Sequence, residues 1–380
     1  MGFGAEELAA RITPKFEENF ARYGELGAAI SIWRRGQPLL ELSGGYRDAG
    51  RELEWINDTL VLFWSATKGL GSACVLHLLQ EREIDLERRV AEFWPEFADH
   101  GKGQITIAQL LSHQAGLVAL DEEVDITDYE AVVRALARQA PLWPPGTAHG
   151  YHARTFGFLI DELVRRIGSQ TIADYWRQTF AEPLGLDIWI GLPAEENDRV
   201  ATIYAAKLSS TIRQSEFYRG LATPGTIQRR TFTSPRGLHS ISGMNTPENR
   251  ARSLVSLGGI GSARALAKFY ALLANGGELD GQRFFSKKTI GWMTRTLVDG
   301  IDRVFEIPTA FSAGFMQDAA ATPRRIFGPS FSAFGHPGAG GSHAFADPEN
   351  ELAFAYVMNQ MEQQILPNEK SLRLVDALYA

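Results

Sequence analysis

A serine and a lysine three residues apart, Ser65 and Lys68, have the residue types and the spacing that nucleophilic catalysis needs. On a helix, side chains at this spacing lie on one face and within reach of each other. A serine hydroxyl is a poor nucleophile until a base accepts its proton. Burial and the first turn of a helix both lower the pKa of a lysine, so Lys68 is a candidate for that base. If Lys68 stays charged, it can instead stabilise the anion of a neighbouring base.

This pair needs support from other motifs, because an S-x-x-K tetrad arises by chance about once in a chain of this size. None of the other lysines has a serine three residues before it. Ser65 and Lys68 also open a predicted helix directly after a short apolar segment, where a nucleophile would be presented to a substrate.

A tyrosine, Tyr151, follows the rigid turn at 143–147 and precedes another predicted helix. On such a loop a tyrosine can accept a proton if nearby cations lower its pKa. The alternative is a half-buried structural aromatic, which is the commoner role of a tyrosine. His149 and His152 offer two metal ligands, but no Asp or Glu of suitable spacing joins them. We therefore expect no metal at this loop.

A glycine-rich run at 335–342 leads into a predicted strand near the end of the chain. Small residues let a substrate approach the main chain closely, so that a backbone N–H can face a developing oxyanion. The alternative is an ordinary flexible turn. The run lacks the strand–GxGxxG–helix context of a nucleotide site.

The order of these motifs, Ser65-x-x-Lys68, then Tyr151, then His336-x-Gly338, resembles that of the serine β-lactamase and penicillin-binding superfamily. Two further segments, at 110–117 and 258–263, resemble the superfamily's "LLSHTSGL" and "GGGLVSTA" segments. The likeness extends from about residue 28 to residue 358 and is greatest to the class C β-lactamase-like carboxylesterases, known as esterase family VIII.

The resemblance implies roles for individual residues. Ser65 would be the acylated nucleophile and Lys68 its cationic or basic partner. Tyr151 would be the general base that also protonates the leaving group. The oxyanion hole would consist of the backbone N–H groups of Ser65 and Ala339, with His336 and Gly338 in the third motif.

Two departures from the class C pattern indicate the substrate. Where those β-lactamases have Tyr-x-Asn, this chain ends the motif on Ala153, which removes a side-chain amide. Where they have Lys-Thr-Gly, this chain has His336, Pro337 and Gly338, which removes a fixed cation for the β-lactam carboxylate. Both changes favour neutral esters over β-lactams.

The elements that must position these motifs follow from hydrophobic patterning. Strand-like segments lie towards both ends of the chain, whereas the middle is helical and rich in loops. The segment 206–250 has no clear period and is predicted to be a long irregular excursion. Predicted helices are 5–23, 65–81, 105–112, 128–139, 155–167, 172–180, 263–274 and 367–380, and predicted strands are 28–33, 38–44, 342–346 and 351–358.

We therefore predict an α/β plus α architecture of the serine β-lactamase and penicillin-binding-protein type. A mainly antiparallel sheet, flanked by helices, would be built from residues 1–75 and 251–380. Residues 76–250 would form an inserted helical domain.

Composition excludes several classes of partner. The 380 residues are 44% hydrophobic and 22% charged and carry a formal net charge of -7, as in an ordinary soluble globular protein. Lysines and arginines are scattered, so we expect no nucleic acid partner. The single cysteine, Cys74, excludes an intrachain disulfide and is expected in the core. Residues 1–26 lack the apolar run of a secretory signal and no stretch is long enough to span a membrane, so we expect a cytoplasmic protein without a membrane partner.

The sequence thus predicts a cofactor-independent serine carboxylesterase that hydrolyses short-chain acyl esters through an acyl-enzyme on Ser65. A β-lactamase or D,D-peptidase and an acyltransferase on the same fold remain as alternatives. A non-catalytic scaffold is a third alternative, against which the intact Ser65, Lys68 and Tyr151 speak.

Overall fold

The computed structural model describes residues 4–206, 209, 213, 215–367 and 369–380. Its first elements are helix α1 (Ala5–Arg22) and a hairpin of strands β1 (Gly27–Arg34) and β2 (Gln37–Gly45). The hairpin turns at Arg35 and Gly36, whose φ angles are 51° and 70°. Positive φ at both turn residues matches the twist of the two strands. The predicted N-terminal helix and hairpin are therefore confirmed.

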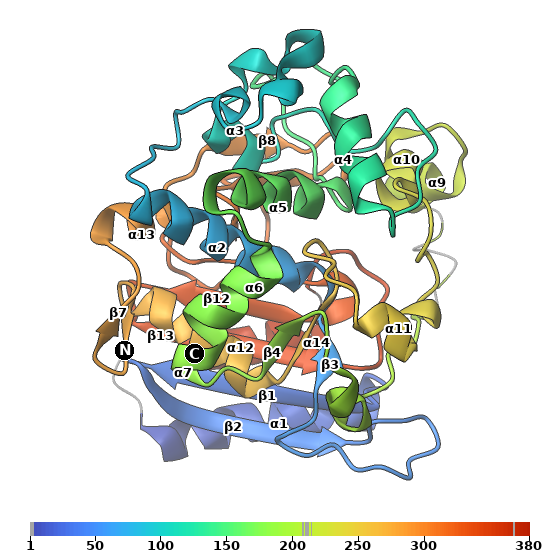
Figure 1. Ribbon diagram of the computed structural model, residues 1–380. Helices are drawn as coiled ribbons and strands as arrows, with labels where there is room; N and C mark the ends of the chain where they lie inside the picture. The colour runs from blue at the N-terminus through green and yellow to red at the C-terminus, as the bar shows by residue number, and fades with distance from the viewer. Residues whose placement is uncertain (1–3, 207–208, 210–212, 214, 368) are drawn as a thin grey trace.

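One eight-stranded antiparallel sheet joins the two ends of the chain (Figure 1). Its strand order is β2-β1-β13-β12-β11-β10-β9-β8, and β1 pairs with β13 so that Ile30 lies opposite Tyr356. Besides β1 and β2, this sheet contains β8 (Val298–Ile301), β9 (Pro308–Phe311), β10 (Met316–Gln317), β11 (Phe334–Gly335), β12 (His343–Asp347) and β13 (Leu352–Met358). The pairing of β1 with β13 confirms the expectation that both ends of the chain contribute to one sheet.

The central strand β13 is buried on both faces, so it forms a continuous apolar run rather than an alternating one. Its small residues, such as Ala353 and Ala355, share a core with helix α12 (Ala263–Ala274). Its large aromatic Phe354 lies in the other core, with residues of α1 and of α14 (Glu369–Tyr379). Helices thus cover both faces of the sheet.

Most of the remaining helices occupy the middle of the chain, and α2 packs against α5 and α6. They are α2 (Thr67–Glu81), α3 (Ile107–Leu111), α4 (Tyr129–Arg138), α5 (Thr155–Gly168), α6 (Ile172–Trp176), α7 (Glu182–Leu184) and α13 (Lys287–Thr294). Tighter, 3-10 helical segments are η1 (Trp64–Ala66), η2 (Val90–Glu92), η3 (Pro95–Gln104), η5 (Ala194–Arg199), η6 (Gly243–Asn245) and η7 (Ala339–Gly341). The segment η4 (Arg177–Ala181) is a wider, π-helical turn. Small sheets are formed by β3 (Val61–Leu62), β5 (Gly259–Gly261) and β4 (Ile188–Ile190), and by β6 (Glu278–Leu279) with β7 (Gln282–Arg283).

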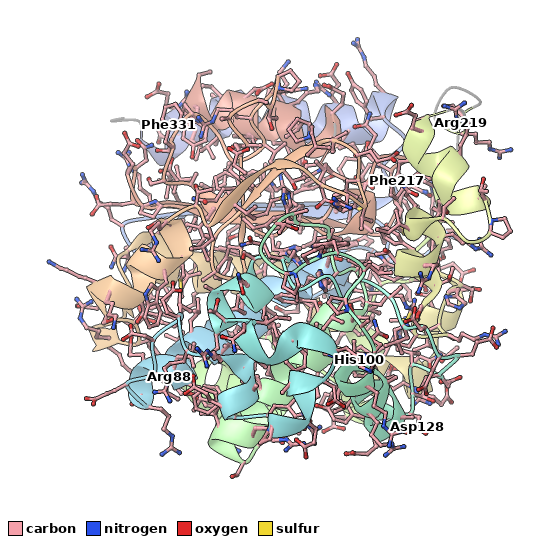
Figure 2. All side chains as sticks on the ribbon, turned by 90° about the horizontal axis from the view of Figure 1, so that it is seen from above. Arg88, His100, Asp128, Phe217, Arg219 and Phe331 are labelled. Atoms are coloured by element: carbon pink, nitrogen blue, oxygen red, sulfur yellow. The ribbon has the colours of Figure 1, made fainter. Side chains whose placement is uncertain are left out.

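The excursion at 206–250 is more regular than predicted. It contains α9 (Glu216–Ala222), α10 (Ile227–Thr233) and α11 (Pro247–Arg250), while positions 207–208, 210–212 and 214 lie outside the described residues. These helices are too short for a hydrophobic period to become visible. On α9, Phe217 is buried and Arg219 lies at the outer edge of the molecule (Figure 2).

No helix in the described part of the chain is both long and apolar enough to cross a membrane.

Candidate active site

Ser65 lies on a turn that two parts of the chain hold in place. The preceding strand β3 pairs with β5, and the Phe63 N–H donates to the Gly259 carbonyl at 3.0 Å. Trp64 then takes a φ of 48°, which is a strained conformation for a bulky residue. The Thr67 hydroxyl stabilises it by donating to the Trp64 carbonyl at 2.5 Å and accepting the Gly259 N–H at 2.8 Å. The turn therefore presents Ser65 directly before α2.

Lys68 is buried in the first turn of α2, beneath Ser65. Its Nζ lies 3.2 Å from the Ser65 Oγ, 2.8 Å from the Ala153 carbonyl and 2.7 Å from the Ser256 carbonyl. Burial, with a smaller contribution from the Arg154 charge, holds the pKa of Lys68 well below its ordinary value. A neutral amine has two N–H groups for the two carbonyls and a lone pair for the Ser65 hydroxyl. The arrangement thus suits a base that accepts the serine proton.

Hydrogen bonds also join the two chain segments whose carbonyls hold Lys68. The Ser256 hydroxyl donates to the Arg154 carbonyl at 3.0 Å and accepts the Gly157 N–H at 2.6 Å. This links the start of α5 to the loop before β5. The Ala153 and Ser256 backbone carbonyls are thereby held beside the Lys68 amine.

Tyr151 is buried beside this pair, and its ring centroid lies 4.9 Å from the Lys68 Nζ. Burial raises the pKa of Tyr151, the Asp302 carboxylate adds to the rise, and a hydrogen bond with Ser65 opposes it. The condition under which Tyr151 would accept a proton, a pKa lowered by nearby cations, is therefore not met, because desolvation of the phenolate dominates. Tyr151 is better placed to relay a proton than to hold a negative charge.

Asp302 is a residue of this site that the sequence analysis missed. Its buried carboxylate accepts the backbone N–H of Tyr151 at 3.2 Å, and those of Val304 at 2.7 Å and Phe305 at 2.9 Å. Phe305 in turn stacks on the Tyr151 ring at 4.8 Å. An Asp that bonds the N–H groups just after it is a recognisable turn signal, but its link to Tyr151 is visible only in the fold.

The third motif packs closely against Phe63, the residue before Trp64. A Cβ on Gly338 would lie 2.1 Å from the Phe63 carbonyl oxygen, so only glycine fits there. Gly340 and Gly341 have φ angles of 82° and 123°. This approach joins the main chain at Gly338 to the residue two positions before Ser65. An oxyanion hole built from the N–H groups of Ser65 and Ala339 stays a prediction.

His336 is neutral in this setting. Its Nδ1 lies 2.9 Å from the Pro337 carbonyl, which only accepts, so Nδ1 carries the proton. Burial lowers the pKa of His336 to about 3. The third motif therefore supplies no fixed cation, in agreement with the sequence argument against β-lactam carboxylates.

The other histidines near Tyr151 support loops. The Nδ1 of His113 accepts the His152 N–H at 3.2 Å, and the Nε2 of His152 accepts the Leu117 N–H at 3.0 Å. His149 pairs with the Thr309 hydroxyl at 2.9 Å. Among the described residues, no group of three or more His, Cys, Asp or Glu side chains is arranged to hold a metal ion.

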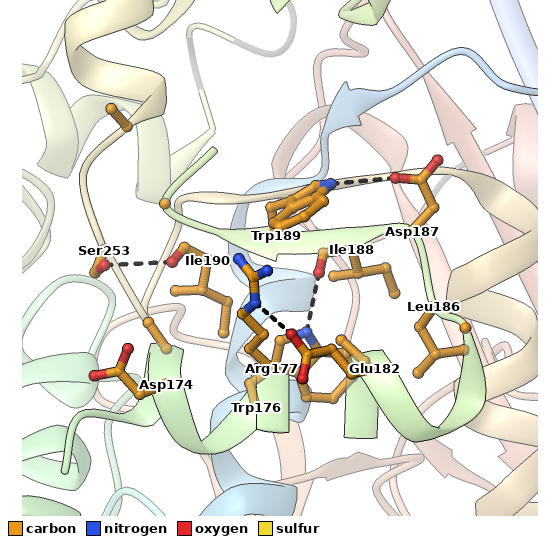
Figure 3. Close-up of a pocket in the computed structure, with 15 residues that line it drawn as sticks. Asp174, Trp176, Arg177, Glu182, Leu186, Asp187, Ile188, Trp189, Ile190 and Ser253 are labelled. Atoms are coloured by element: carbon orange, nitrogen blue, oxygen red, sulfur yellow. Dashed lines mark hydrogen bonds and ion pairs between the residues drawn. The ribbon is translucent and has the colours of Figure 1, made fainter. Parts of the chain in front are cut away.

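Two surface cavities differ in chemistry and in their relation to Tyr151. One, of about 570 Å³, is lined by apolar residues that include Phe217, Phe305 and Ile365, and Phe305 is the ring stacked on Tyr151. The other, of about 420 Å³, lies between α6, α7 and β4 and contains the Arg177–Glu182 ion pair (Figure 3). No residue that lines this second cavity belongs to the Ser65, Tyr151 or His336 motifs.

The fold and these motifs define a protein of the serine β-lactamase type. The chain belongs to the Beta-lactamase family, whose sequence model matches residues 12–376. This membership confirms the predicted fold class and the resemblance on which it rested.

Relatives within the family include enzymes of known class. The chain is 33% identical over 358 residues to "Esterase/beta-lactamase LipL" of Mycobacterium tuberculosis, covering 90% of this chain and 78% of that one. It superimposes with a TM-score of 0.88 on a family VIII carboxylesterase, at 36% identity and covering 100% and 98% of the two chains. For a penicillin-binding protein homologue from Caulobacter crescentus the TM-score is 0.86 at 35% identity, again covering 100% and 98% of the two chains. These similarities support a serine hydrolase activity for this chain.

Proposed function

We propose that the protein is a carboxylesterase that hydrolyses neutral short-chain acyl esters through an acyl-enzyme on Ser65. The observation that carries this proposal is the buried Lys68 amine, held by two main-chain carbonyls at 3.2 Å from the Ser65 Oγ. The absence of a cation at His336 and the similarity to a family VIII carboxylesterase favour an ester over a β-lactam.

The first half of the reaction would form the acyl-enzyme. Neutral Lys68 accepts the proton of Ser65 as the Oγ attacks the ester carbonyl carbon. The N–H groups of Ser65 and Ala339 stabilise the resulting oxyanion. When the bond to the alcohol oxygen breaks, the proton held on Lys68 reaches that oxygen through the Tyr151 hydroxyl. In this scheme Tyr151 never becomes a phenolate, as its raised pKa requires.

In the second half, water would attack the acyl-enzyme carbonyl and lose its proton to the same Lys68 and Tyr151 pair. The bond from the carbonyl carbon to the Ser65 Oγ then breaks, and the serine recovers its proton. The products are a carboxylic acid and the free enzyme. None of these steps needs a metal or a cofactor.

The proposal is tested by hydrolysis of p-nitrophenyl acetate, butyrate and octanoate beside nitrocefin, for wild type and Ser65→Ala. We expect ester turnover that is highest for the short chains and falls by more than about 1,000-fold in Ser65→Ala. Activity that survives in Ser65→Ala would show that the nucleophile is another residue. Nitrocefin turnover without ester turnover would move the protein to the β-lactamases.

A further inference from the structure

A half-buried glutamate, Glu362, lies against the glycine loop of the third motif, and the reaction scheme above does not use it. Its backbone N–H donates to the Gly340 carbonyl at 2.8 Å. Its Oε2 is shielded from solvent and has no hydrogen-bond partner among the described residues. A Cβ on Gly341 would lie 3.5 Å from that oxygen. Glu362 is thus bonded to the loop through its main chain and packed on it through its side chain.

Gly340 and Gly341 let the loop take backbone conformations that side chains rarely adopt, and a Cβ on Gly340 would lie 2.5 Å from the Met361 Cγ. The segment that carries Glu362 is firmly anchored. It directly follows the central strand β13, and the Met361 N–H donates to the Tyr204 carbonyl at 3.0 Å. The Gly340 carbonyl is therefore fixed to the core of the sheet through Glu362, one residue from Ala339.

We propose that Glu362 is a positioning residue of the oxyanion loop, and that the loop stabilises an oxyanion only while this carboxyl is uncharged. The proposal rests on the proposed function, since it takes Ala339 as an oxyanion donor. An anion at Glu362 would place negative charge on the solvent-shielded Oε2, against the loop that carries Ala339, where it would repel the developing oxyanion.

The surroundings of Glu362 keep it protonated at neutral pH. Burial raises its pKa to about 8, Lys370 opposes the rise, and Glu25 and Glu369 add to it. These charged groups come from two parts of the chain. Lys370 and Glu369 belong to α14, Glu25 follows α1, and the Tyr356 hydroxyl of β13 points to Glu25 at 2.5 Å. Lys370 is engaged by Glu25, its Nζ lying 3.2 Å from the Glu25 Oε2, so it is only partly available to Glu362.

The test compares kcat/KM for p-nitrophenyl acetate between pH 6 and pH 10 in wild type and Glu362→Gln, which keeps the shape but cannot ionise. Because the pKa is about 8, we expect the ratio of the Gln variant to wild type to rise about tenfold from pH 7 to pH 9. Glu369→Gln removes a neighbouring charge that raises the pKa of Glu362. In this variant the fall of kcat/KM at high pH should therefore begin at a lower pH than in wild type. A ratio that stays flat would overturn the proposal.

A second readout separates this proposal from the proposed function. Phenylboronic acid forms a tetrahedral anion on a serine nucleophile, so it probes the oxyanion hole whether or not any ester is hydrolysed. Its affinity is measured for both proteins across the same pH range, and the ratio cancels the ionisation of the acid itself. We expect wild type to lose affinity relative to Glu362→Gln as the pH passes 8. Equal losses in the two proteins would overturn the role of Glu362 even if ester hydrolysis is confirmed.

Discussion

Two lysines of this protein are buried to the same degree, yet they differ in what surrounds them. Lys68 is 0% exposed and Lys370 is 2% exposed. The hydrogen-bond partners described for the Lys68 Nζ are all uncharged oxygens. The Lys370 Nζ instead lies 3.2 Å from the buried carboxylate of Glu25.

The difference decides what each lysine can do. An ammonium group that loses its water without gaining an anion tends to release its proton, whereas an ammonium beside a carboxylate forms an ion pair. Lys68 can therefore act as a base next to Ser65. Lys370 instead joins α14 to the end of α1, and the Asn19 side chain reinforces this junction by donating to the Lys370 carbonyl at 3.1 Å. The Glu25 carboxylate beside Lys370 is thus the feature that distinguishes this structural lysine from Lys68.

The largest effect that this comparison predicts is kinetic. Lys68→Met should lower kcat/KM for p-nitrophenyl acetate by about 100- to 10,000-fold, because Ser65 loses its base. Thermal unfolding of the same variant should show that the fold is kept. A variant with near wild-type turnover would mean that another group accepts the serine proton.

The pH dependence of wild type gives a second view of Lys68. If Lys68 acts as a neutral amine, as proposed, kcat/KM should fall as the pH is lowered through the depressed pKa of Lys68. The residual activity of Lys68→Met should not show this fall. If the fall of kcat/KM at low pH persists in Lys68→Met, it comes from another titrating group. The surroundings of Lys68 would then not explain the pH dependence of the enzyme.

Lys370→Met should have the opposite outcome, a loss of stability with little loss of chemistry. Removing one partner of a buried ion pair leaves Glu25 as an unpaired buried carboxylate, which costs about 3–5 kcal/mol of the free energy of unfolding. Urea denaturation measures this loss, and activity is measured per folded molecule. The double variant Glu25→Gln/Lys370→Met should recover part of the stability. A double variant as unstable as the single one would show that the pair matters through packing and not through charge.

The sequence was informative wherever function depends on local spacing. Ser65 and Lys68 lie three residues apart, and the glycines at 338, 340 and 341 indicate a close approach of two main chains. By contrast, the groups that tune Lys68 come from elsewhere in the chain. The Ser256 carbonyl reaches it from the loop before β5, and Asp302 fixes Tyr151 from a distant turn.

The direction of the Tyr151 pKa could not be predicted for a related reason. It depends on how completely the ring is buried and on the Asp302 charge, and both are set by tertiary packing. The role inferred for Glu362 likewise comes from a main-chain bond to Gly340, for which its own side chain gives no sequence signal.

The smallest effect extends the comparison to a buried group that has no partner at all. His343 on β12 is fully buried among Phe327, Phe345 and Phe354, and neither ring nitrogen has a partner among the described residues. Burial lowers its pKa to about 3 from an ordinary value of 6.5. If burial without an ionic partner removes charge, this histidine is neutral in the fold between about pH 3 and pH 6.5, where it is charged in the unfolded chain.

The sign of the effect on stability follows from this difference. Below pH 6.5 the unfolded chain binds a proton that the folded chain does not, so stability is present above that pH and is lost as the pH falls towards 3. Between pH 8 and pH 5, His343 should account for a loss of about 2 kcal/mol. Urea denaturation of His343→Leu should show a pH dependence flatter by that amount, whereas the exposed His100→Asn should keep the wild-type slope. Equal slopes in all three proteins would mean that His343 is protonated in the fold, and that burial alone does not decide the charge of a group inside this molecule.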